Sequence, residues 1–130
     1  HEFNVCSEAT LKLILLLYEC EDYNKASGYL YDYVKDLSES EDQYIRDRVK
    51  GVISSVNHHF RKKWYAEKDI DDIDSPLLSV ADIVMELVGY EYGALQEIYN
   101  SLGNYYGRAG YKDLSKEYYD LAKEAGDLGQ

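Results

Sequence analysis

The stretch Ala94–Gly126, ALQEIYNSLGNYYGRAGYKDLSKEYYDLAKEAG, decides the fold of this chain. Its first half repeats apolar residues at spacings of three and four, the period of one helix face. These residues are Leu95, Ile98, Tyr99, Leu102, Tyr105 and Tyr106. The second half repeats the pattern with Leu114, Tyr118, Leu121, Ala122 and Ala125. Gly107 and Gly110 interrupt it, and Gly110 can adopt positive φ at no steric cost. We predict two antiparallel helices joined by a tight turn.

The same stretch resembles a tetratricopeptide (TPR) repeat, a helix–turn–helix unit of about 34 residues. The family signature is an aromatic residue, a Leu-Gly pair, a Tyr, a Gly, a small residue, an aromatic and an Ala. In this chain it falls on Tyr99, Leu102-Gly103, Tyr106, Gly110, Ser115, Tyr119 and Ala122. The ending AKEAGDLGQ also resembles the related Sel1-type repeat. Ser115 stands where the family usually has Ala, and Asp127 where Pro closes the repeat. An ordinary helical hairpin is the alternative interpretation.

Two further helices are predicted at the start of the chain. Ser7 is a suitable cap for a helix that runs to about Glu21, and Asp22 for a second one over about residues 23–37. Leu13 and Leu16 widen the apolar face of the first helix, which suggests either contact on two sides or a flank that met a neighbour missing from this chain.

The middle of the chain contributes another pair. Ser40-Glu41-Asp42-Gln43 is a capping-box pattern that opens a long helix over about residues 41–64. Its predicted buried stripe advances by three or four residues through Ile45, Val49, Val52, Ile53, Val56, Phe60 and Trp64. Residues 65–75 form the predicted linker, after which Ser75 caps a helix over about residues 76–89. The expected fold class is therefore all-α, with about six helices in antiparallel hairpins. The resemblance implies a TPR-like right-handed superhelical stack.

Length and charge limit the classes of partner. A chain of 130 residues is one domain by size. We interpret residues 1–3 as a cloning remnant, residues 4–130 as a single TPR-like domain, and the whole as a fragment of a longer protein. The formal net charge of −11 disfavours nucleic acid and anionic membranes, which are also polyanions, and favours a basic protein or peptide. The oligomeric state is left open.

The cysteines favour a reducing compartment. A continuous helix would hold Cys6 and Cys20 about 21 Å apart. A disulfide needs Cα atoms within about 7 Å. The apolar run Leu11–Tyr18 is too short to span a bilayer. We therefore expect a cytoplasmic protein without a membrane segment.

No pattern for catalysis, a cofactor or a metal site emerges. His58 and His59 are adjacent, so a helix points them about 100° apart. An EF-hand loop starting at Asp69 fails because Asp74 replaces the required Gly and Val80 the closing Glu. We expect a protein that is not an enzyme and has no cofactor.

The resemblance implies a binding face. TPR arrays bind peptides on the surface lined by the first helix of each repeat, and the corresponding residues here are Glu97, Asn100, Asn104 and Arg108. Chaperone-binding members use an Asn after the Leu-Gly pair, as Asn104 is here, to grip a C-terminal carboxylate. Those members supply a Lys one turn earlier, where this chain has Asn100. The alternative is that all four residues belong to a solvated helix face.

The predicted third helix carries a second candidate site. Its cationic residues are Arg46, Arg48, Lys50, Arg61, Lys62 and Lys63. Positive charge near a helix C-terminus complements the macrodipole, so a solvated face is the plainer interpretation. The functional interpretation is a docking face for an acidic partner.

Two hypotheses about function follow. The first is a noncatalytic scaffold module that binds a protein or peptide partner through its helical hairpins. The second is part of an enzyme or a nucleic-acid-associated effector whose active region lies elsewhere in a longer chain, or at the basic third helix.

Overall fold

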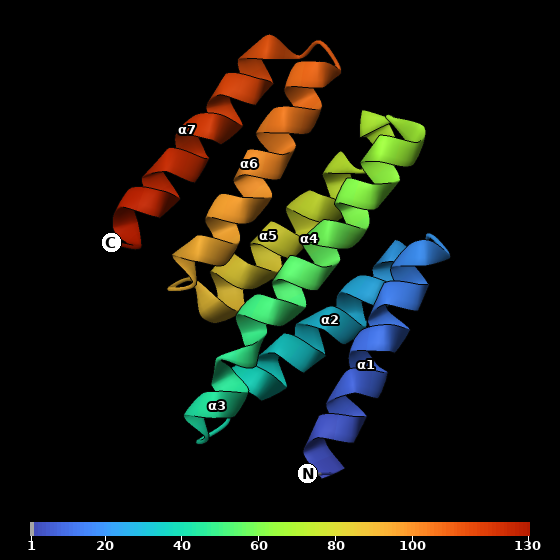
Figure 1. Cartoon of the computed structure of the whole chain (residues 1–130), viewed down its shortest axis with the longest axis vertical. Helices are drawn as coiled ribbons and strands as arrows, with labels where there is room; N and C mark the ends of the chain where they lie inside the picture. The colour runs from blue at the N-terminus through green and yellow to red at the C-terminus, as the bar shows by residue number, and fades with distance from the viewer. Residues whose placement is uncertain (1) are drawn as a thin grey trace. The chain divides into compact units, whose positions relative to one another are not determined.

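The computed structural model describes residues 2–130, with side chains from Glu8 onward. This part of the chain forms seven α-helices and a 3-10 helix and contains no strand, which confirms the predicted all-α class (Figure 1). The elements are α1 (Glu2–Glu19), α2 (Tyr23–Ser38), α3 (Gln43–Arg46), α4 (Arg48–Glu67), η1 (Ile70–Asp72), α5 (Asp74–Val88), α6 (Tyr92–Arg108) and α7 (Lys112–Leu128).

The chain divides into two compact units, His1–Val52 and Ile53–Gln130, so α4 contributes residues to both. In the first unit α1 packs against α2, and α2 against α3. Leu11 and Leu17 of α1 are half-buried and Ile14 and Tyr18 fully buried, as the apolar period predicts. Leu13 and Leu16 are exposed, so the widened apolar face meets no second helix layer among the described residues.

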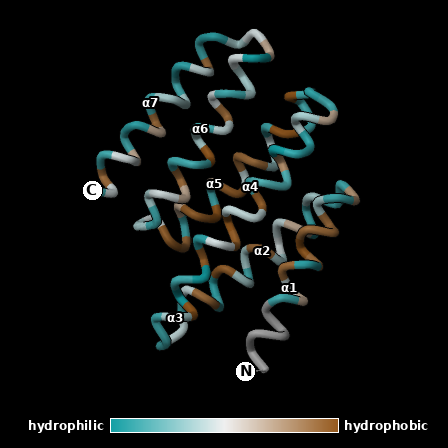
Figure 2. The backbone as a smooth tube through the Cα atoms, viewed as in Figure 1, coloured by the Kyte–Doolittle hydropathy of each residue, from teal (hydrophilic) through white to brown (hydrophobic). Residues whose placement is uncertain are grey.

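The second unit contains the rest of α4 and the elements from η1 to α7 (Figure 1). Hydrophobic residues recur among hydrophilic ones along its helices (Figure 2). The α4 residues Ile53, Val56, Phe60 and Trp64 are buried, so the predicted stripe of this helix faces the core. In α5, Leu77, Val80, Val84 and Val88 are buried at the same helical period.

The α6–α7 hairpin forms as predicted, and Figure 1 shows the two helices running side by side in opposite directions. Gly110 takes φ +95° in the turn, a conformation that residues with a Cβ rarely adopt. The backbones approach closely at Gly103, where an added Cβ would come within 2.8 Å of the Tyr119 ring. The buried hydroxyl of Ser115 donates a hydrogen bond of 2.7 Å to the Gly103 carbonyl. TPR membership and the superhelical stack stay predictions.

Several predicted helix limits were wrong. Helix α1 begins at Glu2 rather than after Ser7, whose side chain lies outside the described residues. The Ser40 capping box does not form, because the Ser40 hydroxyl accepts from the Asp42 amide at 3.1 Å. Asp42 is the cap instead, and its carboxylate accepts from the Tyr44 amide at 2.9 Å.

The expected long third helix is interrupted at Asp47, which separates α3 from α4. Helix α5 begins at Asp74, before the predicted cap Ser75, and the Asp74 carboxylate accepts from the Ser75 amide at 2.7 Å. Asp22 holds its predicted cap position but makes no side-chain cap bond. Gly89 ends α5 as predicted.

We compare Gly103→Ala with Gly28→Ala. We expect the free energy of unfolding of the Gly103→Ala variant to be lower than that of the Gly28→Ala variant by about 1–3 kcal/mol. Gly28 of α2 has no atom near its added Cβ, so the change should gain up to about 1 kcal/mol of helix propensity. At Gly103 the same gain is opposed by displacement of the Tyr119 ring. Urea unfolding of both variants measures the difference, and equal stabilisation would contradict the close packing of α6 and α7.

Candidate functional site

A buried polar network joins α4 to α6 in the second unit. Asn57 of α4 is fully buried, and its amide donates to the Ser101 hydroxyl at 3.0 Å and to the Glu97 carboxylate at 3.2 Å. The Ser54 hydroxyl donates to the same Glu97 oxygen at 3.2 Å. Buried polar groups must find partners, so this network sets how α4 and α6 align along their lengths.

Next to this network lies a small hollow of about 150 Å³ between α4 and α6. Its lining residues are Arg61, Trp64 and Tyr65 of α4, and Ser101, Asn104, Tyr105 and Arg108 of α6. The rings of Trp64 and Tyr105 stack with centroids 5.0 Å apart and planes inclined by 27°. Both residues are buried, so this stack is a rigid wall of the hollow.

The lining of the hollow offers a ligand many hydrogen-bond donors but few free acceptors. Arg61 and Arg108 carry only donors and form no ion pair among the described residues. The Asn104 side-chain oxygen accepts a hydrogen bond from the Tyr119 hydroxyl of α7, which leaves the Asn104 NH₂ group as its donor toward other partners. The Ser101 oxygen already accepts from Asn57. No carboxylate lines the hollow, although the chain holds 25 Asp and Glu residues.

The Tyr105 hydroxyl is shielded from water and makes no hydrogen bond of normal geometry, which is costly for a buried polar group. Burial raises the pKa of Tyr105, while Ser101 and the Arg61 guanidinium are near enough to oppose that rise partly. The hydroxyl therefore keeps its proton at neutral pH and can donate it. The polar groups that the hollow presents are therefore two guanidinium groups and an amide NH₂, a set of donors suited to an anion.

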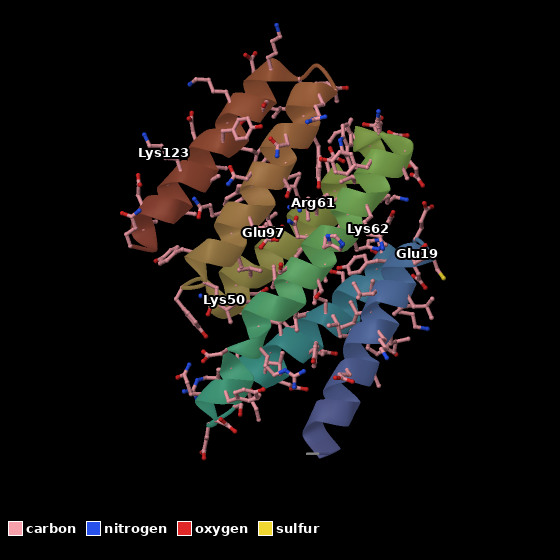
Figure 3. All side chains as sticks on the ribbon, in the orientation of Figure 1. Glu19, Lys50, Arg61, Lys62, Glu97 and Lys123 are labelled. Atoms are coloured by element: carbon pink, nitrogen blue, oxygen red, sulfur yellow. The ribbon has the colours of Figure 1, made fainter. Side chains whose placement is uncertain are left out.

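The four residues that the resemblance assigned to a binding face have different surroundings. Asn104 and Arg108 line the hollow, whereas Asn100 is exposed and does not line it. Glu97 is half-buried and hydrogen-bonded to α4 (Figure 3), so its carboxylate is engaged in the seam between the helices.

The six cationic residues of the second candidate site are spread over α3 and both ends of α4. The Arg46 guanidinium donates to the Ser40 carbonyl and to Gln43, both at 2.6 Å. Arg48 and Lys50 lie in the first unit, in the first turn of α4.

The run Arg61-Lys62-Lys63 lies in the second unit, and its three side chains have different surroundings. Arg61 lines the hollow, Lys62 is exposed outside it, and Lys63 pairs with Glu67 at 3.2 Å. The structure therefore brings Arg61 together with Asn104 and Arg108, three residues that belonged to two separate predicted sites.

Sequence reasoning missed Asn57, Ser101, Trp64 and Tyr105 as parts of a site. Trp64 and Tyr105 were assigned to the core, where they do lie. The available signal was polar: Asn57 falls four residues after Ile53 and three before Phe60, on the buried stripe of its helix. A buried amide within an apolar stripe indicates a hydrogen-bonded contact to another element.

The other chemical candidates do not gather into a site among the described residues. Among the described residues, no group of three His, Cys, Asp or Glu side chains could hold a metal ion. His58 is exposed, and the half-buried His59 packs its ring edge-on against Phe60. Cys20 is a free, exposed thiol, and the predicted lack of pairing with Cys6 lies outside the described residues. The Asp69 carboxylate accepts from the Asp71 amide and caps η1.

In the part of the chain that the structure describes, no helix has both the length and the apolar character needed to cross a membrane. Comparison with protein-family models, with curated proteins and with solved structures finds no match for this chain. The arrangement of its own residues is therefore the basis for any assignment of function.

We expect Asn57→Asp to lower the free energy of unfolding at neutral pH by at least about 3 kcal/mol. The change places a carboxylate in a fully buried position beside Glu97, so burial and repulsion raise the pKa of the new group above its unfolded value. The destabilisation is therefore complete above that raised pKa and fades as the pH falls toward about 4.

Chemical unfolding at pH 7 and at a mildly acidic pH measures this effect, with Asn100→Asp as the matched control. Asn100 is exposed on α6, so the same substitution should change stability little at either pH. Equal stability of the two variants at pH 7 would show that the seam tolerates a charge.

Proposed function

We propose that this chain is a cytoplasmic, noncatalytic interaction module that binds an acidic group of a peptide or protein partner in the hollow between α4 and α6. The observation that carries the proposal is the donor-rich lining: Arg61, Arg108 and the Asn104 NH₂ group around a space without a carboxylate. Guanidinium groups bind carboxylates through paired hydrogen bonds, so a Glu, an Asp or a chain terminus is the fitting ligand chemistry.

The size of the hollow supports one anchoring group rather than a whole ligand. A space of about 150 Å³ is smaller than the cavities that enclose drug-sized molecules, which are about 300–1,000 Å³. A partner segment would therefore insert one side chain or terminus and lie along the exposed surface nearby, where Tyr65 leaves 60% of its area exposed. The net charge of −11 opposes an acidic partner at long range, so these local donors would decide affinity.

TPR membership belongs to this proposal too, because the α6–α7 hairpin has the expected turn and close contact at the signature positions. In such a repeat α6 would be the first helix, and Asn104 and Arg108 lie on it. Arg61 adds a cation from α4 that the signature positions do not include.

Trp64 is the only tryptophan of the chain and lines the hollow, so its fluorescence should report occupancy directly. We expect a short peptide with internal Glu residues and blocked ends to change this emission. Arg61→Gln or Arg108→Gln should each weaken its binding by about 5- to 50-fold, because each removes a charged donor. Lys62→Gln is the control: it removes the same charge from the next residue of α4, which does not line the hollow.

Two additional peptides identify the acidic group. In the first, Gln replaces Glu, and binding should be lost if a Glu side chain occupies the hollow. In the second, the Gln peptide has a free C-terminus, and binding should return if a terminal carboxylate can occupy the hollow. Equal affinities of all three single variants would contradict the proposed site, as would a Trp64 signal that no acidic peptide changes.

A further inference from the structure

A second surface of the same unit consists of tyrosines from α6, α7 and the turn between them, with a methionine from α5. Tyr118 lies between Tyr106 and Tyr99, with ring centroids 5.5 Å and 6.1 Å away and planes inclined by 17° and 34°. Tyr111 meets Tyr106 edge-on at 6.1 Å. We call Met85, Tyr99, Tyr106, Tyr111 and Tyr118 the tyrosine surface.

The tyrosine surface is partly open to solvent and held in place by hydrogen bonds. Met85 and Tyr111 are 56% and 50% exposed, and Tyr99 and Tyr118 are half-buried. The Tyr99 hydroxyl donates to the Met85 sulfur at 3.3 Å, and the Tyr106 hydroxyl donates to the Asp74 carboxylate at 3.0 Å. These bonds tie rings on α6 to the neighbouring α5, so the aromatic faces are preorganised.

Carboxylates surround these rings. Asp82 and Glu124 act on the Tyr99 hydroxyl, Asp74 and Asp71 on that of Tyr106, and Glu117, Asp74 and Asp82 on that of Tyr118. Together with burial, which is the larger effect, they raise the pKa of all three phenols. The ionised side chains named for these three hydroxyls are all carboxylates, which favours a negative local potential.

An aromatic surface inside a ring of carboxylates matches one kind of occupant. The face of an aromatic ring attracts a cation within about 6 Å, and the flat guanidinium of arginine also stacks on such a face. The surrounding carboxylates can pair with its N–H groups, and the net charge of −11 draws a basic segment toward the chain. Neither attraction serves a neutral or acidic segment.

We propose that the tyrosine surface binds an arginine-bearing segment of a partner protein, with a guanidinium stacked on the exposed rings and paired with the carboxylates around them. This site shares α6 with the hollow but differs from it in its residues, its charge and its ligand, and it goes beyond the function proposed above. A partner with both acidic and basic groups could use the two sites together, yet each site stands on its own residues.

The test uses the blocked peptide acetyl-Gly-Arg-Gly-Arg-Gly-amide and the same peptide with citrulline, which keeps the shape of arginine but has no charge. NMR titration should show the arginine peptide shifting the ring signals of Tyr99 and Tyr118. The citrulline peptide should bind at least about fivefold more weakly, as expected for loss of a cation–aromatic contact. Raising the salt concentration to about 0.5 M should weaken the binding of the arginine peptide more than that of the citrulline peptide.

Variants locate the site. Asp82→Asn/Glu124→Gln removes two exposed carboxylates whose charge raises the pKa of Tyr99. This double variant should bind the arginine peptide about fivefold more weakly, or weaker still. Asp36→Asn/Glu41→Gln makes the same change in net charge at exposed residues of the first unit and should leave binding unchanged. Tyr118→Leu should also weaken binding, with its fold checked by circular dichroism. Equal binding of both peptides, or equal weakening by both charge variants, would overturn the proposal.

Discussion

The second unit depends on the contact between α4 and α6, and the centre of that contact is the fully buried Asn57 amide. Apolar side chains alone would let two helices slide past each other at little cost, because hydrophobic attraction is not directional. The two bonds that the Asn57 NH₂ group donates to Ser101 and Glu97 restrict this freedom, since a shift of either helix would break them and add to the buried polar atoms without partners, of which the Asn57 side-chain oxygen is already one. Further along both helices, about two turns after Asn57 and one after Ser101, the rings of Trp64 and Tyr105 stack on each other.

Helix α6 contributes residues to both candidate sites, the hollow and the tyrosine surface. Because Asn57 and Trp64 hold one side of α6 against α4, Asn104 and Arg108 come next to Arg61. The positions that face α5 and α7 instead carry Tyr99 and Tyr106, whose hydroxyls reach Met85 and Asp74 of α5. A single amphipathic helix thus separates a donor-rich hollow from a carboxylate-rich aromatic surface, although the chain as a whole is acidic.

Helical period and turn chemistry were enough to predict the six long helices and the α6–α7 hairpin, because the apolar spacing and Gly110 act locally. Helix starts were harder, since Ser40, Asp42, Asp74 and Ser75 all suit a cap and small differences in local hydrogen bonding decide among them. The hollow was predictable only in part: Asn104 and Arg108 were named from one helix and Arg61 from another. Their meeting depends on the tertiary contact through Asn57, which no local pattern expresses.

The bond between Tyr119 and Asn104 has a consequence for how the hairpin responds to a ligand. Because the Tyr119 hydroxyl on α7 engages the Asn104 oxygen, the orientation of the amide group beside the hollow depends on α7 remaining docked. Linkage then works in both directions: an anion held by that amide would disfavour the opening of α7, and a loosened α7 would lower the affinity for the anion. Helix α7 contributes no residue to the lining of the hollow, yet its docking would thereby help to retain the ligand there.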